Sequence, residues 1–510
     1  MARKSFYVTT PIYYVNDVPH IGHGYSTIIA DTMARYKRLA GNDVLFLTGT
    51  DEHGQKVEKA ARDRGLSPQE HCDLMVGPWK ELWGKLNISY SDFIRTTQER
   101  HIKVVQAIFQ KLYEQDDIYK GYYEGWYCIH EETFYPESQL VEGCCPQCGR
   151  AVEWLREESY YFRSSKYQDS LLEYINSNPG FVQPNFRRNE VVSFIEGGVQ
   201  DTSVSRTTIK WGIPVPFDPD HVVYVWFDAL INYLTGSGYL QDEAKYDKFW
   251  PADVHVIGKD IIRFHAVIWP MMLMALGIEL PKKVLATGFW TLGGEKISKS
   301  TGVVVDPNRL IEEYGEDTIR YFLLREISIG ADGEFTQDAV IRRINGDLAN
   351  DLGNLVHRTV AMMMKYFDGA IPEAGELGPL EVALKDEVLA LADIVDEAMS
   401  RVDIREALVQ IWRIIGRANK FIDEAAPWSL AKEGNTERLQ TVMRTLLEAI
   451  RVVTVLVTPV MPHTAEKIWA QLGQSDFASV TLDDARKWDT LAAGTSVKKA
   501  EPLFPRIEVT

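Results

Sequence analysis

Two short stretches carry side chains that could bind phosphate. The first is His20-Ile21-Gly22-His23, which opens a segment with apolar residues at helical spacing as far as Leu39. Histidines three residues apart share one face of a helix, and the first turn of a helix attracts phosphate through its N–H groups and its dipole. The second stretch is Lys296-Ile297-Ser298-Lys299-Ser300, two cations in a glycine-flanked loop. Judged singly, the histidines could merely cap the helix, and the lysines could line a solvated loop.

These residues need a scaffold that brings the ends of several strands together. Residues 5–10 are predicted as a strand, 21–39 as a helix and 43–48 as a second strand. Such a unit is typical of a doubly wound parallel sheet, in which ligands bind at the carboxyl edge of the strands. Asp51 follows the second strand and is well placed there to pair with an ammonium group. Further strands are predicted at 222–228, at 253–260, where a strand runs into a helix start, and at 283–292.

The rest of the chain changes character twice. An insertion separates the two halves of the sheet, and beyond about residue 340 long amphipathic helices are predicted at 338–368, 379–399, 403–424 and 436–457. The predicted fold is therefore α/β, a doubly wound Rossmann-type parallel sheet with an inserted connective domain, followed by an all-α helical bundle. The expected domains are the first half of the sheet (1–115), the insertion (116–225), the second half of the sheet (226–295), the lysine loop and linker (296–340) and the bundle (341–510).

Length and composition exclude several classes of protein. A chain of 510 residues with a net charge of −17 cannot bind nucleic acid through a broad basic surface, so any RNA contact must use local patches. No apolar run reaches the length of a membrane span, and no signal-peptide core follows the N-terminus. Five cysteines are sparse for this length, which is typical of a reducing compartment. We expect a cytoplasmic protein that contacts no membrane.

Cysteines in the insertion leave two interpretations open. Cys145 and Cys148 have the two-residue gap of a zinc knuckle, but upstream only Cys128 is a thiol, and the residue three positions beyond it is Glu131. The segment therefore allows either bound zinc or a metal-free remnant, and no metal ligand is assigned.

The paired stretches resemble the HIGH and KMSKS signatures of class I aminoacyl-tRNA synthetases. Other segments resemble the methionyl-tRNA synthetases within that class: Pro11 to His23, Thr50-Asp51-Glu52-His53-Gly54, Tyr224 to Ala229, Gly258-Lys259-Asp260 and Phe264-His265. An insertion of about 110 residues leaves no room for the editing domain of the enzymes for leucine, isoleucine and valine.

The resemblance implies a ligase that activates methionine with ATP and transfers it to methionine tRNA, both initiator and elongator. It implies Mg²⁺ as a cofactor, with Zn²⁺ left open, and a monomer, because the chain ends soon after the bundle without the appended domain of some relatives. DNA is not an expected partner. The resemblance implies that ATP is bound by His20, Gly22, His23, Gly258, Asp260, Lys296 and Lys299, and that His20, His23, Lys296 and Lys299 are catalytic. For methionine it implies Ile12, Tyr14, Asp51, Trp226, Ala229, Leu230, Tyr233, Ile261 and His265. For the anticodon it implies Asn350, Asn354 and Trp428.

Two other functions compete with this interpretation. One is a catalytically silent paralogue that binds tRNA or a nucleotide, although a site that has lost its catalytic activity would not need Lys299. The other is an adenylyltransferase that acts without tRNA. Methionine-dependent exchange of pyrophosphate into ATP, and sensitivity of charging to the anticodon, would separate the three.

Overall fold

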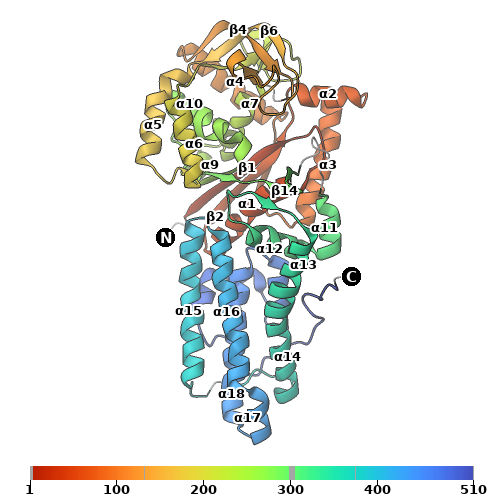
Figure 1. Cartoon of the computed structure of the whole chain (residues 1–510). Helices are drawn as coiled ribbons and strands as arrows, with labels where there is room; N and C mark the ends of the chain where they lie inside the picture. Colours follow the sequence, from red (N-terminus) through yellow and green to blue (C-terminus); the bar gives the residue numbers. More distant parts are fainter. Residues whose placement is uncertain (1–3, 131–132, 298–304, 374, 509–510) are drawn as a thin grey trace.

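A six-stranded parallel sheet lies in the middle of the molecule, with the inserted domain at one end and the helical bundle at the other (Figure 1). The structure is a computed structural model that describes residues 4–130, 133–297, 305–373 and 375–508. Within these residues, no helix combines the length and the apolar character that crossing a bilayer requires.

The sheet has the strand order β3-β2-β1-β12-β13-β7, and every neighbouring pair is parallel. From the two central strands the chain progresses outward in opposite directions, to β2 and β3 on one side and to β13 on the other. The carboxyl ends of β1 and β12 therefore form a topological switch point, the usual ligand site of such sheets. The strands are β1 (Ser5–Tyr14), β2 (Asp43–Asp51), β3 (Asp92–Arg95), β7 (Val182–Gln183), β12 (Val254–Gly258) and β13 (Val284–Thr287).

Both faces of the sheet are buried, each in its own hydrophobic cluster. Phe6 and Val8 on β1 point into the cluster that contains helix α1 and extends through the bundle. Tyr7, between them, points into the opposite cluster. This alternation explains why β1 carries apolar side chains on both of its faces. Apart from the inserted domain, the helices of the first 280 residues are α1 (Ile21–Leu39), α2 (Gln55–Asp63), α3 (Pro68–Lys85), α4 (Glu99–Glu114), α7 (Val225–Leu230), α8 (Asn232–Ser237), α9 (Glu243–Phe249), η3 (Lys259–Ile261), η4 (Phe264–Ile268) and α10 (Trp269–Leu276).

The prediction of a strand at 222–228 is wrong. Strand β11 (Asp218–Val223) ends earlier and is antiparallel to β9 (Ser205–Arg206) and β10 (Pro214–Val215), outside the main sheet. Helix α7 follows directly. A continuous apolar run of this length suits a buried strand or a buried helix equally, and here both faces of the run are buried.

The predicted strand at 283–292 divides into two. β13 stays in the main sheet, whereas β14 (Trp290–Leu292) joins β15 (Glu295–Lys296) and β16 (Gly333–Glu334) in a small separate sheet. Gly288 lies at the break, where an added Cβ would stand 2.0 Å from the carbonyl oxygen of Ala331. The chain can change sheets there because glycine allows this close approach.

The inserted domain is built on a four-stranded antiparallel sheet in the order β5-β4-β6-β8. Its elements are β4 (Ile118–Cys128), β5 (Thr133–Tyr135), η1 (Glu137–Gln139), β6 (Glu153–Phe162), η2 (Ser164–Tyr167), α5 (Gln168–Ser177), α6 (Asn185–Glu196) and β8 (Thr202–Ser203). Its chain also supplies β7, so the insertion completes one edge of the main sheet.

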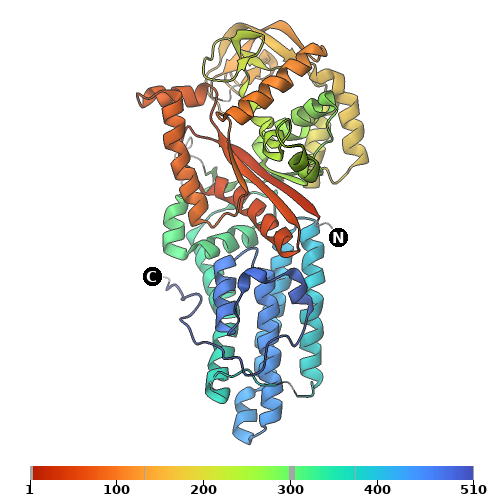
Figure 2. The ribbon, with the colours of Figure 1, turned by 180° about the vertical axis from the view of Figure 1, so that it is seen from behind.

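The bundle confirms the predicted helices. Its first helix is continuous through α13 (Gln337–Arg343), the π-helical segment η6 (Ile344–Gly353) and α14 (Asn354–Phe367). From behind, the C-terminal segment crosses one face of the bundle (Figure 2), where the backbone N–H of Ile371 donates to the carbonyl of Thr495. The other helices are α11 (Pro307–Tyr314) and α12 (Glu316–Glu326) before the bundle, then α15 (Pro379–Ser400), α16 (Ile404–Ala425), α17 (Pro427–Glu433), α18 (Thr436–Val457), α19 (Pro462–Gln471), η7 (Phe477–Ser479) and η8 (Leu482–Arg486).

Candidate active site

His20 and His23 cap helix α1 with their own rings. Nδ1 of His20 accepts the backbone N–H of Gly22 at 3.1 Å, and Nδ1 of His23 accepts the backbone N–H of His20 at 3.2 Å. The two ring centroids are 3.7 Å apart. Because each Nδ1 acts as an acceptor, each neutral ring carries its proton on Nε2. Both residues therefore serve as caps through Nδ1, and the N–H donor of each ring is Nε2.

Gly22 leaves room for the capping ring of His20. A Cβ at this position would lie 3.0 Å from Cε1 of His20, so any larger residue would displace the capping ring.

Aromatic rings hold His23 from the side. The ring of His23 lies 5.1 Å from that of Tyr13 and 4.9 Å from that of Trp79, and these two rings stack at 4.9 Å. The Tyr13 hydroxyl and that of Thr27 on α1 are 2.8 Å apart. Tyr13 was predicted only as part of the segment from Pro11 to His23. Trp79 was not predicted, because it lies on helix α3 and no sequence pattern relates its position to the two histidines.

The hairpin that leads into the lysine loop lies against the same helix. Trp290 on β14 meets Tyr25 on α1 edge to face, with ring centroids 5.8 Å apart. The backbone N–H of Ile297, a buried residue, donates to the carbonyl of Trp290 at 3.0 Å. Lys296 lies on β15 directly before Ile297, and Lys299 lies outside the described residues. Helix α1 and the start of the loop, far apart in sequence, thus share one hydrophobic core.

Gly258 and Asp260 stand at the switch point, as predicted. β12 ends at Gly258 next to β1, and Asp260 follows in η3 as an exposed residue. A Cβ on Gly258 would lie 2.5 Å from Oδ1 of Asp260, so glycine is what allows the carboxylate to fold back over the strand end.

An aromatic group lies nearby, on elements that meet at the carboxyl end of β1. The ring of Trp226 on α7 stacks on Phe264 at 3.9 Å with an angle of 5° between planes. The Trp226 ring also meets the rings of Tyr14 on β1 and His265 on η4 edge to face, with ring centroids 6.5 Å apart in each pair. Ile12 and Ile261 are half-buried and, like Phe264, pack against the hydrophobic cluster in which Leu230 is buried; Ala229 is buried as well. Phe264 was not among the predicted site residues, although the Phe264-His265 pair is one of the segments that resemble the family.

His265 is held as a neutral ring. Its Nδ1 is 3.0 Å from the carbonyl of Ile261, which can only accept, so Nδ1 carries the proton and Nε2 accepts from the Tyr233 hydroxyl at 2.8 Å. Burial lowers the pKa of His265 to about 4. At neutral pH the pair adds hydrogen-bonding capacity without adding charge to the aromatic group.

Asp51 closes β2 in the position expected for it. The residue is 3% exposed and pairs in register with Tyr14 across the two strands. Two residues later, His53 Nδ1 contacts Asp228 Oδ2 at 2.7 Å, and the other oxygen of Asp228 contacts Nε2 of His101 at 2.7 Å. Burial alone would raise the pKa of the Asp228 carboxyl, but the two histidines lower it overall. This network, which the sequence did not reveal, ties the end of β2 to helix α7.

Three thiols meet in the inserted domain. The Sγ atoms of Cys128, Cys145 and Cys148 all lie within 4.8 Å of one another, and those of Cys128 and Cys148 are 3.5 Å apart. Sulfur ligands of a tetrahedral zinc ion stand about 3.8 Å apart, so the cluster fits three corners of such a site. Glu131 lies outside the described residues.

The three residues expected at the anticodon lie on three elements of the bundle, η6, α14 and α17. Asn350, exposed on η6, accepts from the guanidinium of Arg506 in the C-terminal segment, and Nδ2 of Asn354 on α14 is 3.4 Å from Oδ1 of Asn419 on α16. Trp428 on α17 is 46% exposed, so it is not a core residue. α17 follows α16 after one left-handed residue, at the far end of the bundle (Figure 1).

Comparisons with known proteins assign a family to the whole chain. Residues 6–153 and 148–360 match the family model "tRNA synthetases class I (M)", and residues 371–510 match "Anticodon binding domain of methionyl tRNA ligase". Methionine–tRNA ligase of Caldanaerobacter subterraneus subsp. tengcongensis is 54% identical over 99% of this chain and 80% of its own length. That of Clostridium tetani is 53% identical over 100% of this chain and 79% of its own length.

The fold comparison gives the same family. The structure of Mycobacterium tuberculosis methionyl-tRNA synthetase in complex with methionyl-adenylate superposes with a TM-score of 0.94 and 44% identity, covering 99% of this chain and 100% of that one. The resemblance drawn from the sequence motifs is confirmed, and the chain belongs to the methionyl-tRNA synthetases, within class I of the aminoacyl-tRNA synthetases.

Proposed function

We propose that the chain activates methionine with ATP at the carboxyl end of β1 and β12, and then transfers methionine to the 3′ end of methionine tRNA. The observation that carries this assignment is the contact of Trp290 with Tyr25, because it brings the start of the lysine loop to the helix that His20 and His23 cap. Both phosphate-binding stretches then serve one nucleotide.

In the first step the methionine carboxylate attacks the α-phosphorus of ATP, and pyrophosphate leaves with the bonding electron pair. The carboxylate is ionised at neutral pH, so no general base is required. Catalysis then depends on positioning and on stabilising the charge that moves onto the phosphates. The Nε2–H groups of His20 and His23 donate to the phosphates, and Lys296 and Lys299 neutralise the leaving pyrophosphate. Mg²⁺, when bound, would neutralise phosphate charge as well.

Adenylate formation also needs the ribose to be held. Asp260, folded back over Gly258, is the proposed acceptor for ribose hydroxyls, since a carboxylate accepts from two hydroxyls at once. In the second step a terminal ribose hydroxyl of tRNA attacks the carbonyl carbon of the adenylate and AMP leaves.

Methionine has a charged ammonium group at one end and an apolar side chain at the other, and each needs its own contacts. Asp51 takes the ammonium group, and the aromatic group around Trp226 takes the side chain together with Ile12, Tyr14, Ala229, Leu230, Tyr233, Ile261 and His265. A thioether gains from contact with aromatic rings. A neutral His265 suits it better than a charged ring, because no ion has to be desolvated.

Outside the catalytic half, Asn350, Asn354 and Trp428 are proposed to read the anticodon. An exposed tryptophan suits stacking on an unpaired base. The cluster of Cys128, Cys145 and Cys148 is proposed to hold Zn²⁺ as a structural ion. A cytoplasmic monomer stays a prediction, which light scattering checks for the oligomeric state.

Pyrophosphate exchange across the amino acids tests this function. Methionine alone should drive exchange of labelled pyrophosphate into ATP. Exchange with another amino acid would reassign the substrate, and exchange with none would favour a silent binding protein. Charging that is insensitive to the anticodon would favour an adenylyltransferase that needs no tRNA.

A further inference from the structure

Three side chains that commonly bind metals meet at a cavity outside the candidate active site. Glu316 and Asp317 open helix α12, and His463 is the second residue of helix α19, 147 positions beyond Glu316. One oxygen of each carboxylate and one ring nitrogen of His463 all lie within 4.8 Å of one another. All three residues line a cavity of about 160 Å³. Because one water needs only about 10–15 Å³ of such a cavity, an ion and several waters fit there.

Asp317 is a buried carboxylate with one oxygen unsatisfied. The residue is 5% exposed, and its Oδ2 accepts the backbone N–H of Thr464 at 2.6 Å. Its Oδ1 is buried too and has no hydrogen-bond partner among the residues that the structure describes. A buried carboxylate oxygen without a partner costs free energy, and an ionised carboxylate can only accept. A cation is therefore the partner that Oδ1 needs.

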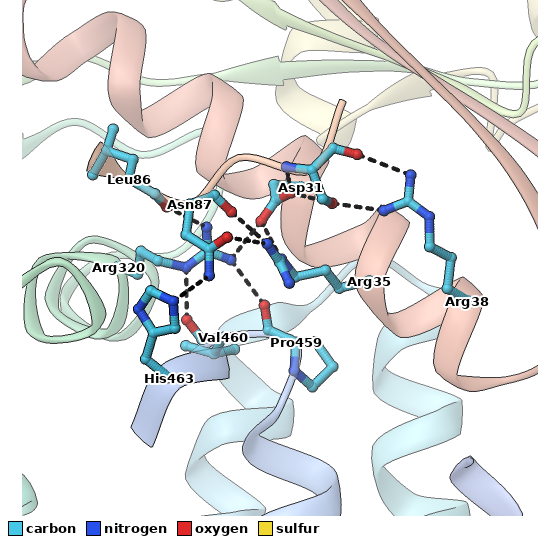
Figure 3. A network of polar contacts seen from close by, with 10 residues as sticks. Asp31, Arg35, Arg38, Leu86, Asn87, Arg320, Pro459, Val460 and His463 are labelled. Atoms are coloured by element: carbon cyan, nitrogen blue, oxygen red, sulfur yellow. Dashed lines mark hydrogen bonds and ion pairs between the residues drawn. The ribbon is translucent and has the colours of Figure 1, made fainter. Parts of the chain in front are cut away.

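His463 brings a nitrogen ligand to the same place. Its Nδ1 contacts Oε1 of Glu316, so one proton lies between the two atoms. A metal ion can replace that proton and bind both atoms. Nε2 of His463 is 3.2 Å from the side-chain nitrogen of Asn87, as Figure 3 shows. The Asn87 amide can present its N–H or its oxygen to Nε2, so it can hold the ring in either protonation pattern, as a partner of a metal-binding histidine does.

Arg320 fixes the two helices that supply these ligands. It lies one turn beyond Asp317 on α12, and its guanidinium donates to the carbonyls of Pro459 at 2.9 Å and Val460 at 2.8 Å, just before α19 (Figure 3). Arg320 is fully buried and also pairs with Asp31 at 2.7 Å. The ligands from α12 and α19 are therefore already held close together, which reduces the cost of binding an ion.

We propose that Glu316, Asp317 and His463 bind a divalent metal ion of the Mn²⁺ class, with water at its remaining positions. Carboxylates and water suit Mn²⁺, and imidazole is a common ligand of transition metals. The two carboxylates balance both charges of the ion. The site contains no thiol, so its metal preference differs from that of the three-cysteine cluster. It shares no residue with the candidate active site, so it does not depend on the proposed function.

Two other residues of the cavity provide controls of different sign. Glu313 and Lys467 line the same cavity but do not belong to the ligand cluster. If the ion is held by direct ligation, removing the Glu313 charge should matter little, because charges that do not touch the ion are screened. Removing the Lys467 charge should strengthen binding, since a nearby like charge opposes a cation.

The test is Mn²⁺ binding to the full chain without ATP, with free Mn²⁺ measured by EPR spectroscopy. Mn²⁺ is the probe because thiolates select softer metals, so the three-cysteine cluster does not interfere. We expect one site per chain in the parent. His463→Gln and Glu316→Gln should each weaken binding at least about tenfold, because even the loss of a hydrogen bond to a ligand costs about 10- to 100-fold. Glu313→Gln should stay within about twofold of the parent, and Lys467→Gln should bind more tightly.

Thermal unfolding gives a second measurement on the same variants. The ligands come together only in the folded chain, so Mn²⁺ should raise the Tm of the parent and of Glu313→Gln but not of His463→Gln. The His463 side chain is 49% exposed, so His463→Gln opens no core cavity. No Mn²⁺ site in the parent, undiminished binding in either ligand variant, or an equal loss in Glu313→Gln would overturn the proposal. Failure of the proposed function would instead appear as absent methionine-dependent exchange in the parent.

Discussion

The indole of Trp290 meets the ring of Tyr25 edge to face at 5.8 Å and an angle of 84°. Tyr25 is two residues beyond His23, and Trp290 is six residues before Lys296. The contact sets where the lysine loop begins relative to the capped helix start. Two motifs that are separated by most of the catalytic half are therefore parts of one packed unit.

The cap and the proposed ligand contact of His20 can be separated by substitution. His20→Asn keeps a good N-cap side chain but loses the Nε2–H donor, whereas His20→Ala loses both. We expect His20→Ala to cost about 1 kcal/mol of stability and His20→Asn to cost less. Both should reduce pyrophosphate exchange by roughly 10²-fold, as for loss of a donor to a transition state. Urea denaturation and exchange kinetics measure the two effects. Recovery of exchange in His20→Asn would show that His20 acts only as a cap.

Replacing Lys299 tests whether the stretch from Lys296 to Ser300 takes part in adenylate formation. Lys299→Ala should lower adenylate formation at least about tenfold, because the leaving pyrophosphate loses a cation. The expected loss is in kcat, with a smaller change in KM for methionine, whose proposed site does not include Lys299. Lys282→Ala is a suitable control, since its partner is Asp253 at 2.8 Å near the opposite end of β12. An unchanged rate in Lys299→Ala would remove this lysine from the mechanism.

The positions of several candidate site residues could be predicted because these residues stand at the ends of elements. His20 follows a strand and opens a periodic helix, Asp51 ends β2, and Gly258 ends β12, so each position was readable from local pattern. The bundle helices were predicted for the same reason, since their apolar stripes are long and punctuated by proline.

Other features could not be predicted from spacing. Trp79 reaches His23 from a separate helix, and Asp228 bonds to His53 and His101 across three elements. Such contacts depend on tertiary packing, which no local pattern encodes. The run at 222–228 was misassigned because it is apolar on all sides, so it lacks the alternation that separates strand from helix.

His265 should make stability depend on pH in a definite window. Its pKa is about 4 in the folded protein and about 6.5 when unfolded. The unfolded chain therefore binds the extra proton first as the pH falls, and stability is lost between about pH 6.5 and pH 4. The loss is about 3 kcal/mol for this group. His265→Gln cannot titrate and should show a shallower decline, measured by urea denaturation at several pH values. Equal pH profiles for parent and variant would contradict a buried neutral histidine.

The thiol cluster should bind one zinc ion per chain. Cys148→Ser removes one of three clustered ligands and should lose the metal after dialysis, as measured by elemental analysis. Cys72→Ser is the matched control, because Cys72 is a buried free cysteine outside the cluster. Zinc should remain at the parent level in that variant. A parent protein purified with added zinc that still contains none would establish the metal-free alternative.

Trp428 should contribute to tRNA binding and not to adenylate formation. Its side chain is 46% exposed on α17, so Trp428→Ala removes a stacking surface without opening a core cavity. Stacking of one base is worth about 1–3 kcal/mol, which corresponds to a rise in KM for tRNA of roughly 5- to 150-fold. Trp154→Ala is the control, since Trp154 is 54% exposed on the inserted domain. Charging kinetics should show a raised KM for tRNA in Trp428→Ala alone, with pyrophosphate exchange unchanged in both variants. A fall in exchange in Trp428→Ala would mean that α17 supports the fold of the catalytic half and does not act through the anticodon.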